Sequence, residues 1–298
     1  MNTMTNPKWL NTKEYPFKPN FFKTSVGNMH YVDEGKGEPI IFIHGNPSWS
    51  YEFRNMIKKL SKTHRCIAPD HIGFGLSDKP VDWTYLPKDH AKNLETLFES
   101  LNLENITLFV GDWGGPIGLS YAINHPNKLN NLVITNTWLW SVKNDWYYKL
   151  FSKLGGGSVG RWLINWYYQS FSKYAGGSVG KWSFGSSFGD RNKLTSEIYK
   201  HYIKPFDNPK TRKGCWVFPK EIIGSSDWLQ SLWDQHYVLK DKNILIAWGM
   251  KDTSFREKDL NQWIKSFPEA KVVRYEDAGH FVAEEKPNEL IKEIKKFF

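Results

Sequence analysis

The most constraining feature of this 298-residue chain is a short apolar run that stops at an acidic residue and gives way to glycines. The stretch covers residues 105–118, with Asp112 in its middle. The run before Asp112 predicts a buried strand. Gly114-Gly115-Pro116 after it is typical of a helix start, because proline suits a first helical turn and glycine lets two backbones approach closely. The sequence therefore predicts a strand, a sharp turn at Asp112 and a helix.

A carboxylate at the apex of such a turn has two interpretations. It is an anion at neutral pH and can displace a leaving group from an sp3 carbon, which would give an ester of Asp112 itself. It can also simply cap the helix that begins at Trp113. This stretch alone is compatible with both interpretations, so the rest of the chain must decide.

Strand and helix patterns alternate along most of the chain. Two alternating runs joined at Gly27-Asn28 predict a hairpin over 21–33, and the apolar run 39–43 predicts a central strand that ends at His44-Gly45-Asn46-Pro47. Further strands are expected at 64–69, 131–136, 243–249 and 271–275, and helices at 49–60, 88–101, 255–266 and the C-terminus. This rhythm predicts an α/β fold with a mostly parallel central sheet and active loops at the strand carboxyl ends.

The rhythm stops between residues 138 and 219, where the chain becomes aromatic and helical in pattern. Residues 145–164 and 165–184 are identical at 12 of 20 aligned positions, which indicates a tandem duplication. We interpret 1–137 and 220–298 as one core domain and 138–219 as an inserted helical cap that closes a pocket over the strand carboxyl ends.

The duplicated unit contains two motifs that point to other chemistry. Gly156-Gly-Ser158-Val-Gly160 and its copy at 176–180 spell G-x-S-x-G, which marks a serine nucleophile only after a strand. Helical patterns precede both copies. The partial dinucleotide fingerprint at 155–160 also lacks its strand. These glycines are more simply interpreted as turns that end helices.

Composition limits the compartment and the partners. Net charge is +9, but lysines and glutamates alternate near the C-terminus, which is typical of a solvated face and argues against nucleic-acid binding.

The two cysteines, Cys66 and Cys215, are expected to be free buried thiols. No segment resembles a signal peptide or a membrane span, so we expect a cytoplasmic protein without a membrane partner. The 48 aromatic residues (15 Trp, 14 Tyr, 19 Phe) fit an aromatic-lined cavity or a generous core equally well.

An enzyme with Asp112 as nucleophile must hydrolyse its own ester, so it needs a water-activating base, an acid that holds this base, and donors for an oxyanion. His280 lies in a Gly-His loop after the last predicted strand, and Asp252 follows the strand before it. This order of nucleophile, acid and histidine is the one expected for an α/β-hydrolase fold. The loop at Asn46 is where a second oxyanion N–H group is expected. Taken singly, His280 could be an ordinary loop histidine and Asp252 a turn residue.

Five motifs together resemble the haloalkane dehalogenases across almost the whole chain: His44-Gly-Asn-Pro-Ser-Trp-Ser50, Pro69-Asp-His-Ile-Gly-Phe-Gly-Leu-Ser-Asp-Lys-Pro80, Asp112-Trp-Gly-Gly-Pro-Ile-Gly118, Trp248-Gly-Met-Lys-Asp252 and Ala278-Gly-His-Phe281. Phe188-Gly-Asp-Arg191 in the predicted cap extends the resemblance. The resemblance implies Asp112 as nucleophile, His280 as base and Asp252 as acid, with Asn46 and Trp113 as halide ligands. The doubled cap unit departs from the family pattern.

The expected reaction is hydrolysis of a haloalkane to an alcohol and halide through a covalent ester of Asp112, with no metal or organic cofactor. The partners are then a small halogenated alkane, water and a halide ion. Two alternatives stay open. An epoxide hydrolase would share the Asp112 elbow and add cap tyrosines, for which residues 147, 148, 167, 168 and 174 are candidates. A ligand-binding protein without catalysis is the other, which the complete set of Asp112, Asp252 and His280 argues against.

Overall fold

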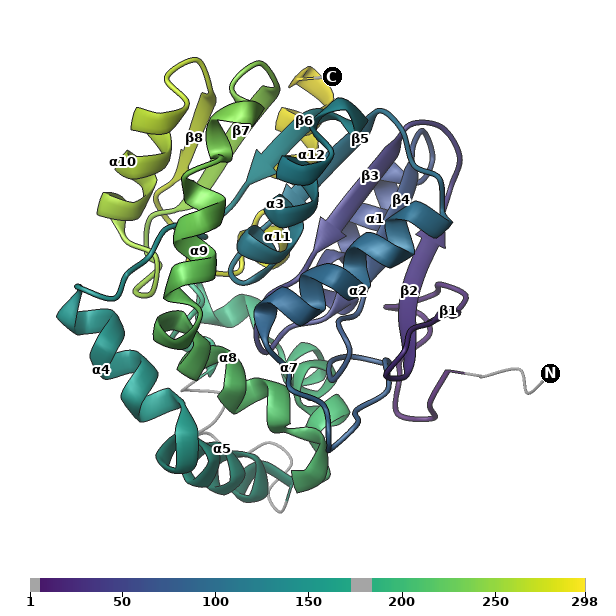
Figure 1. The fold of residues 1–298 in the computed structure, drawn as a ribbon. Coiled ribbons are helices and arrows are strands. Elements are labelled where there is room, and N and C mark those ends of the chain that lie inside the picture. The colour runs from purple at the N-terminus through teal and green to yellow at the C-terminus, as the bar shows by residue number, and fades with distance from the viewer. Residues whose placement is uncertain (1–5, 173–183, 298) are drawn as a thin grey trace.

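A computed structural model describes residues 6–172 and 184–297, and an eight-stranded sheet forms its centre (Figure 1). The strands are β1 (Asn20–Lys23), β2 (Asn28–Glu34), β3 (Pro39–Ile43), β4 (Arg65–Pro69), β5 (Ile106–Val110), β6 (Leu129–Ile134), β7 (Asn243–Gly249) and β8 (Lys271–Tyr275). Their order across the sheet is β1-β2-β4-β3-β5-β6-β7-β8. The last six strands in this order pair in parallel, and the β1–β2 hairpin joins β4 antiparallel. The predicted hairpin and mostly parallel sheet are confirmed.

Helices cover both faces of the sheet (Figure 1). One buried cluster joins the sheet to α2, α3 and α10, and the other joins it to α1, α11 and α12. β3 and β5 are wholly buried, since a strand covered by helices on both faces has no solvent side. The helices of these layers are α1 (Arg54–Leu60), α2 (Pro87–Ser100), α3 (Gly114–Asn124), α10 (Glu257–Ser266), α11 (Val282–Glu285) and α12 (Pro287–Phe297).

The segment between β6 and β7 is helical; its earlier helices gather beyond the carboxyl ends of the strands, whereas the last one, α9, packs beside α3 (Figure 1). They are α4 (Trp146–Gly155), α5 (Gly157–Ser172), α7 (Ser196–Ile203), α8 (Lys213–Gly224) and α9 (Ser226–Trp233). The predicted boundary after residue 219 falls inside α8, because Pro219 lies within that helix and does not end it. The division into a core and a cap stays a prediction.

The duplicated unit has a glycine turn in its first copy, as expected. α4 ends at Gly155, and Gly157, the first residue of α5, has a positive φ of 61°, which favours glycine. A helix, not a strand, therefore precedes the Gly-x-Ser-x-Gly motif at 156–160. α5 then runs across the border between the two copies, and residues 173–183 of the second copy, including its own Gly-x-Ser-x-Gly, lie outside the described residues.

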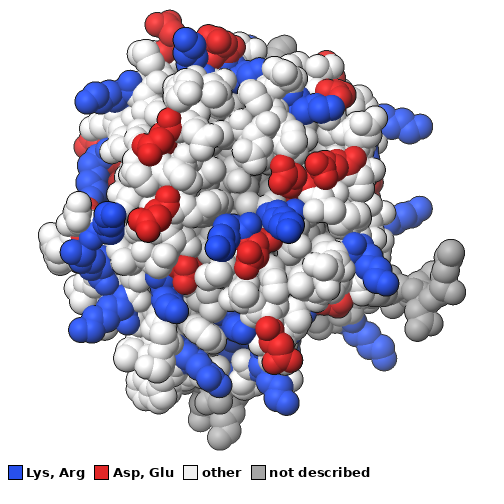
Figure 2. All heavy atoms as spheres, in the orientation of Figure 1, with Lys and Arg blue, Asp and Glu red and all other residues white. Residues whose placement is uncertain are grey.

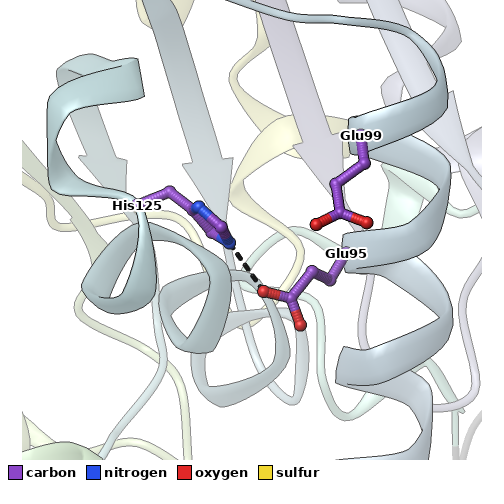
Figure 3. A group of neighbouring side chains, drawn as sticks. All are labelled: Glu95, Glu99 and His125. Carbon is purple, nitrogen blue, oxygen red and sulfur yellow. Dashed lines mark hydrogen bonds and ion pairs between the residues drawn. The ribbon is translucent and has the colours of Figure 1, made fainter.

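The surface is mixed in charge. Figure 2 shows basic and acidic side chains interspersed on one face of the molecule. Figure 3 shows Glu95 and Glu99 of α2 beside His125, which follows α3; His125 Nε2 lies 2.6 Å from Glu95 Oε1. Ligand atoms of these three residues lie within 4.8 Å of one another, but the His125 ring is already paired with Glu95, so we interpret the group as an ion pair between two helices.

Two expectations from composition can be compared with the structure. Cys66 and Cys215 are both buried and neither is in a disulfide, as predicted. No helix within the described residues is long and apolar enough to cross a bilayer. The cytoplasmic location stays a prediction.

Candidate active site

Asp112 occupies the sharp turn between β5 and α3. Its backbone has a φ of 48°, a left-handed conformation that costs roughly 1–2 kcal/mol for a residue other than glycine. The neighbouring loop after β6 holds it there, because Asp112 N donates to Asn136 O (2.9 Å) and Thr137 Oγ1 donates to Asp112 O (2.5 Å). A carboxylate is thus fixed at the carboxyl end of a central strand, as the sequence predicts.

Two backbone N–H groups act on the Asp112 carboxylate. Asn46 N donates to Asp112 Oδ1 at 2.7 Å, and the N–H of Trp113 also lowers the pKa of this carboxylate. A Cβ atom on Gly45 would lie 2.2 Å from Asp112 Oδ1, so only glycine lets the loop after β3 come this close. Burial raises the pKa of Asp112, while His280 and the two N–H groups favour its charged form. The same two donors could stabilise an oxyanion formed on Asp112.

His44 holds the loop that carries Asn46. Its Nδ1 lies 2.8 Å from Gly45 O, and its Nε2 accepts a hydrogen bond from the backbone N–H of His71 at 2.9 Å. Burial lowers the pKa of His44, and its two hydrogen bonds suit the neutral ring with the proton on Nδ1. His44 is therefore a structural residue that fixes the position of the Asn46 N–H group.

His280 lies between two carboxylates. Its Nδ1 is 2.7 Å from Asp252 Oδ2, and its Nε2 is 3.7 Å from Asp112 Oδ2. Burial alone would lower the pKa of His280, but Asp252 and Asp112 outweigh burial and raise it to about 9. An ester on Asp112 would remove one of these negative charges, which would make the ring easier to deprotonate.

The acid Asp252 is fully hydrogen-bonded. Its Oδ2 accepts from Asn136 Nδ2 at 3.0 Å in addition to His280, and its Oδ1 accepts from Ser254 N at 2.7 Å. Asn136 also bridges to the end of β7, since its Oδ1 accepts from Gly249 N and its Nδ2 donates to Gly249 O. Asn136 therefore positions Asp252, a role that the sequence analysis missed. The available signal was a polar residue at the end of a predicted strand.

The loop that carries His280 is held from the predicted cap. His280 N donates to Ser187 O at 2.7 Å. Buried Glu285 accepts hydrogen bonds from Gly189 N (3.1 Å) and Gly279 N (2.8 Å) on the two facing loops. The Phe-Gly-Asp-Arg motif at 188–191 thus has a structural role in holding the His280 loop, which the sequence did not predict.

A cavity of about 290 Å³ opens above this group. Asn46, Asp112, Trp113 and His280 form its base, and Asp252 lies behind His280. All five residues predicted from the sequence therefore lie together. The remaining walls are mostly aromatic and apolar, with residues 147, 148, 151, 184 and 219 from the predicted cap among them. The indole of Trp113 is held between Phe218, which stacks on it at 5.3 Å, and the edge of Trp138 at 4.7 Å.

Comparisons with known proteins bear on the fold and the family of this chain. A family model described as alpha/beta hydrolase fold matches residues 38–287. The chain is 35% identical over 297 residues to a cis-3-alkyl-4-alkyloxetan-2-one decarboxylase of Shewanella oneidensis, covering 95% of this chain and 88% of the relative. It is 31% identical over 282 residues to haloalkane dehalogenase 2 of Mycobacterium tuberculosis, covering 94% of each. The solved structure of haloalkane dehalogenase DbeA from Bradyrhizobium elkani superposes with a TM-score of 0.79 at 23% identity, covering 94% of this chain and 96% of that one.

Proposed function

Because this chain belongs to the haloalkane dehalogenase family of α/β hydrolases, we propose that it hydrolyses haloalkanes to alcohol and halide through an ester of Asp112. The observation that carries this proposal is the carboxylate at position 112. One of its oxygens accepts the Asn46 N–H, and the other faces His280. A non-catalytic binding protein would have no need for this complete set of groups.

The first step is displacement of halide. Asp112 Oδ2 forms a bond to the sp3 carbon, and the carbon–halogen bond breaks with its electron pair on the halide. The side-chain amide of Asn46 and the indole N–H of Trp113, both at the base of the cavity, are the proposed donors to the leaving halide.

The second step is hydrolysis of the ester. Neutral His280 takes a proton from water at Nε2 while the water oxygen attacks Cγ of Asp112. The resulting oxyanion is stabilised by the backbone N–H groups of Asn46 and Trp113. The imidazolium, held by Asp252, then gives its proton to the departing alkoxide, and the new carboxylic acid of Asp112 loses its proton to solvent. Overall, one haloalkane and one water molecule are consumed, and one alcohol, one halide ion and one proton are formed.

Two of the five candidate tyrosines, Tyr147 and Tyr148, have described side chains, and both favour halide chemistry over epoxide opening. An epoxide hydrolase needs tyrosine hydroxyls that donate to the epoxide oxygen. Here Tyr147 donates to Thr253 O at 2.9 Å, and the hydroxyl of Tyr148 lies 3.0 Å from both Ser254 O and Asp259 Oδ2. Both hydroxyls are thus engaged with the loop after β7, and that of Tyr148 also with α10. The other three candidate tyrosines lie in residues 167–183, whose side chains are outside the described part of the chain.

A β-lactone decarboxylase is the second candidate, because the relative with that activity in its name is 35% identical over 95% of this chain. Asp112 would displace the ring oxygen from its sp3 carbon, which frees a carboxylate. Loss of CO2 would then form the carbon–carbon double bond and expel Asp112 again as a carboxylate. This route consumes no water, so it would not require His280 as a base.

A product panel tests these candidates together. The purified protein is given 1-bromobutane, 1-bromohexane, an alkyl epoxide and a cis-disubstituted β-lactone, and bromide, diol and CO2 are measured. Bromide together with an equal amount of alcohol is expected. If CO2 comes from the lactone while no bromide is released, the decarboxylase is the correct function, and diol without bromide would identify an epoxide hydrolase.

Halide binding provides a separate prediction. Bromide should quench the tryptophan fluorescence saturably, and Asn46→Ala should weaken this binding about 10- to 100-fold, because a charge-assisted hydrogen bond worth roughly 1.5–3 kcal/mol is lost. The variant keeps the backbone N–H that binds Asp112, so only the side-chain donor is tested. Asn288→Ala, at an exposed position on α12, is the control. Equal bromide affinity in the Asn46→Ala and parent proteins would exclude Asn46 as a halide ligand.

A further inference from the structure

A second, much smaller cavity lies beside Asp112. Its volume is about 10 Å³, close to the room that one water molecule needs. Asn46, Asp112, His280 and Phe281 line both this cavity and the substrate cavity, so the Asp112 carboxylate lies between the two spaces. An alkyl group that reaches Asp112 through the large cavity would leave the small cavity accessible to water.

Glu52 is a second carboxylate on the wall of this small cavity, besides Asp112. It belongs to the short 3-10 helix Ser50–Phe53, and it accepts a hydrogen bond from Ser48 Oγ at 2.5 Å. Burial raises the pKa of Glu52 to about 7, although Ser48 and His280 favour its charged form. The catalytic scheme above makes no use of this carboxylate.

Glu284, which also acts electrostatically on Glu52, is already paired with other groups. Glu284 accepts two hydrogen bonds from Arg54, at 2.5 and 2.7 Å, and a third from Tyr202 at 2.8 Å. Glu284 and Asp112 raise the pKa of Glu52, whereas His280 lowers it. Across the small cavity, His280 is therefore the cationic partner of Glu52, and the electrostatic effect is mutual, because Glu52 in turn raises the pKa of His280.

We propose that Glu52 orients the hydrolytic water in the small cavity and stabilises the His280 imidazolium during ester hydrolysis. This inference rests on the proposed function and adds a residue to its second step. The water donates one hydrogen to His280 Nε2 and the other to the Glu52 carboxylate, and its oxygen forms the bond to Cγ of Asp112. The proton moves to His280 alone, so Glu52 neither gains nor loses one in the step.

The decisive variant is Glu52→Gln, which preserves the shape of the side chain and an oxygen for Ser48 but loses the charge. Rapid quenching followed by intact-protein mass measurement follows the ester on Asp112. Formation of the ester from a bromoalkane should be unchanged, and its decay should slow about 10- to 100-fold, because a hydrogen bond to a charged group is lost. Since only the second step is affected, kcat and KM should fall together and kcat/KM should stay constant.

A purely structural role for Glu52 predicts a different result. Damage to the Asn46 loop through Ser48 would slow ester formation and lower kcat/KM, which would overturn the proposal. An unchanged ester decay would overturn it as well. Glu95→Gln is the matched control. Glu95 lies on α2, where it pairs with His125, and its substitution should leave the rates of both steps as in the parent.

A measurement without substrate separates this inference from the proposed function. The His280 ring should titrate near pH 9 in the parent, as followed by NMR. In Glu52→Gln the pKa should fall, because a nearby negative charge favours the protonated ring. In Glu95→Gln it should not change. If the parent forms no ester from any bromoalkane, the dehalogenase function is wrong, and this titration still decides whether Glu52 acts on His280. Equal titration in all three proteins contradicts the proposal.

Discussion

Replacement of His280 by alanine is expected to stop the reaction after its first step, with the alkyl group of the substrate still attached to Asp112. Halide displacement needs only the carboxylate and the halide donors, so one equivalent of bromide should still be released. Ester hydrolysis needs a base at the place of His280 Nε2, which lies 3.7 Å from Asp112 Oδ2. Steady-state turnover should therefore fall about 10⁴-fold or more, since the base has no replacement.

Two measurements check this prediction. Intact mass of the variant after incubation with a bromoalkane should increase by one alkyl group, located by peptide mapping on Asp112. In the parent enzyme, a single turnover in heavy-oxygen water should place the label in Asp112 before it appears in the alcohol, because water attacks the carboxyl carbon. His236→Ala is a suitable control, because His236 stacks on Trp233 outside the site. Label that enters the alcohol directly, with none in Asp112, would exclude the ester mechanism.

The same variant discriminates between the two candidate functions. The decarboxylase route consumes no water, so a β-lactone decarboxylase should keep much of its activity without His280. A dehalogenase should lose steady-state activity by about 10⁴-fold or more.

The change Asp252→Asn is expected to lower turnover by about 10⁴-fold while the protein stays folded. Asp252 Oδ2 accepts the hydrogen bond from His280 Nδ1 at 2.7 Å. An asparagine amide can donate to Nδ1 instead, and this would leave the proton on Nε2, where a base must be free of it. The loss of charge should also lower the pKa of His280 from about 9, since Asp252 is the main group that raises it.

Steady-state bromide release and the NMR titration of His280 test this variant, with circular dichroism as the check of folding. Asp277→Asn is the matched control, because Asp277 lies three residues before His280 but pairs with Lys286 on the surface. Near-normal turnover in folded Asp252→Asn would show that another carboxylate holds the histidine.

The sequence alone determined the sheet and the place of the main reactive groups. The apolar run before Asp112 and the glycines after it are local signals, and local patterns specify whether a stretch becomes a strand, a turn or a helix. Because β3, β5 and β7 are parallel, their carboxyl ends meet at one edge of the sheet. That geometry alone was enough to predict that Asn46, Asp112 and Asp252 would lie close together.

Only the tertiary structure decided which side chains meet across the molecule. Asn136 holds Asp252 from 116 positions away, and the Glu52 carboxylate reaches the cavity beside His280. No local pattern predicts the partner of either side chain. Each contact depends on the packing of two elements that are far apart in sequence. With another neighbour, Asn136 or Glu52 would be an ordinary polar side chain. The pKa of His280 has the same origin, because burial and the carboxylates of Asp252 and Asp112 act on it through space and not along the chain.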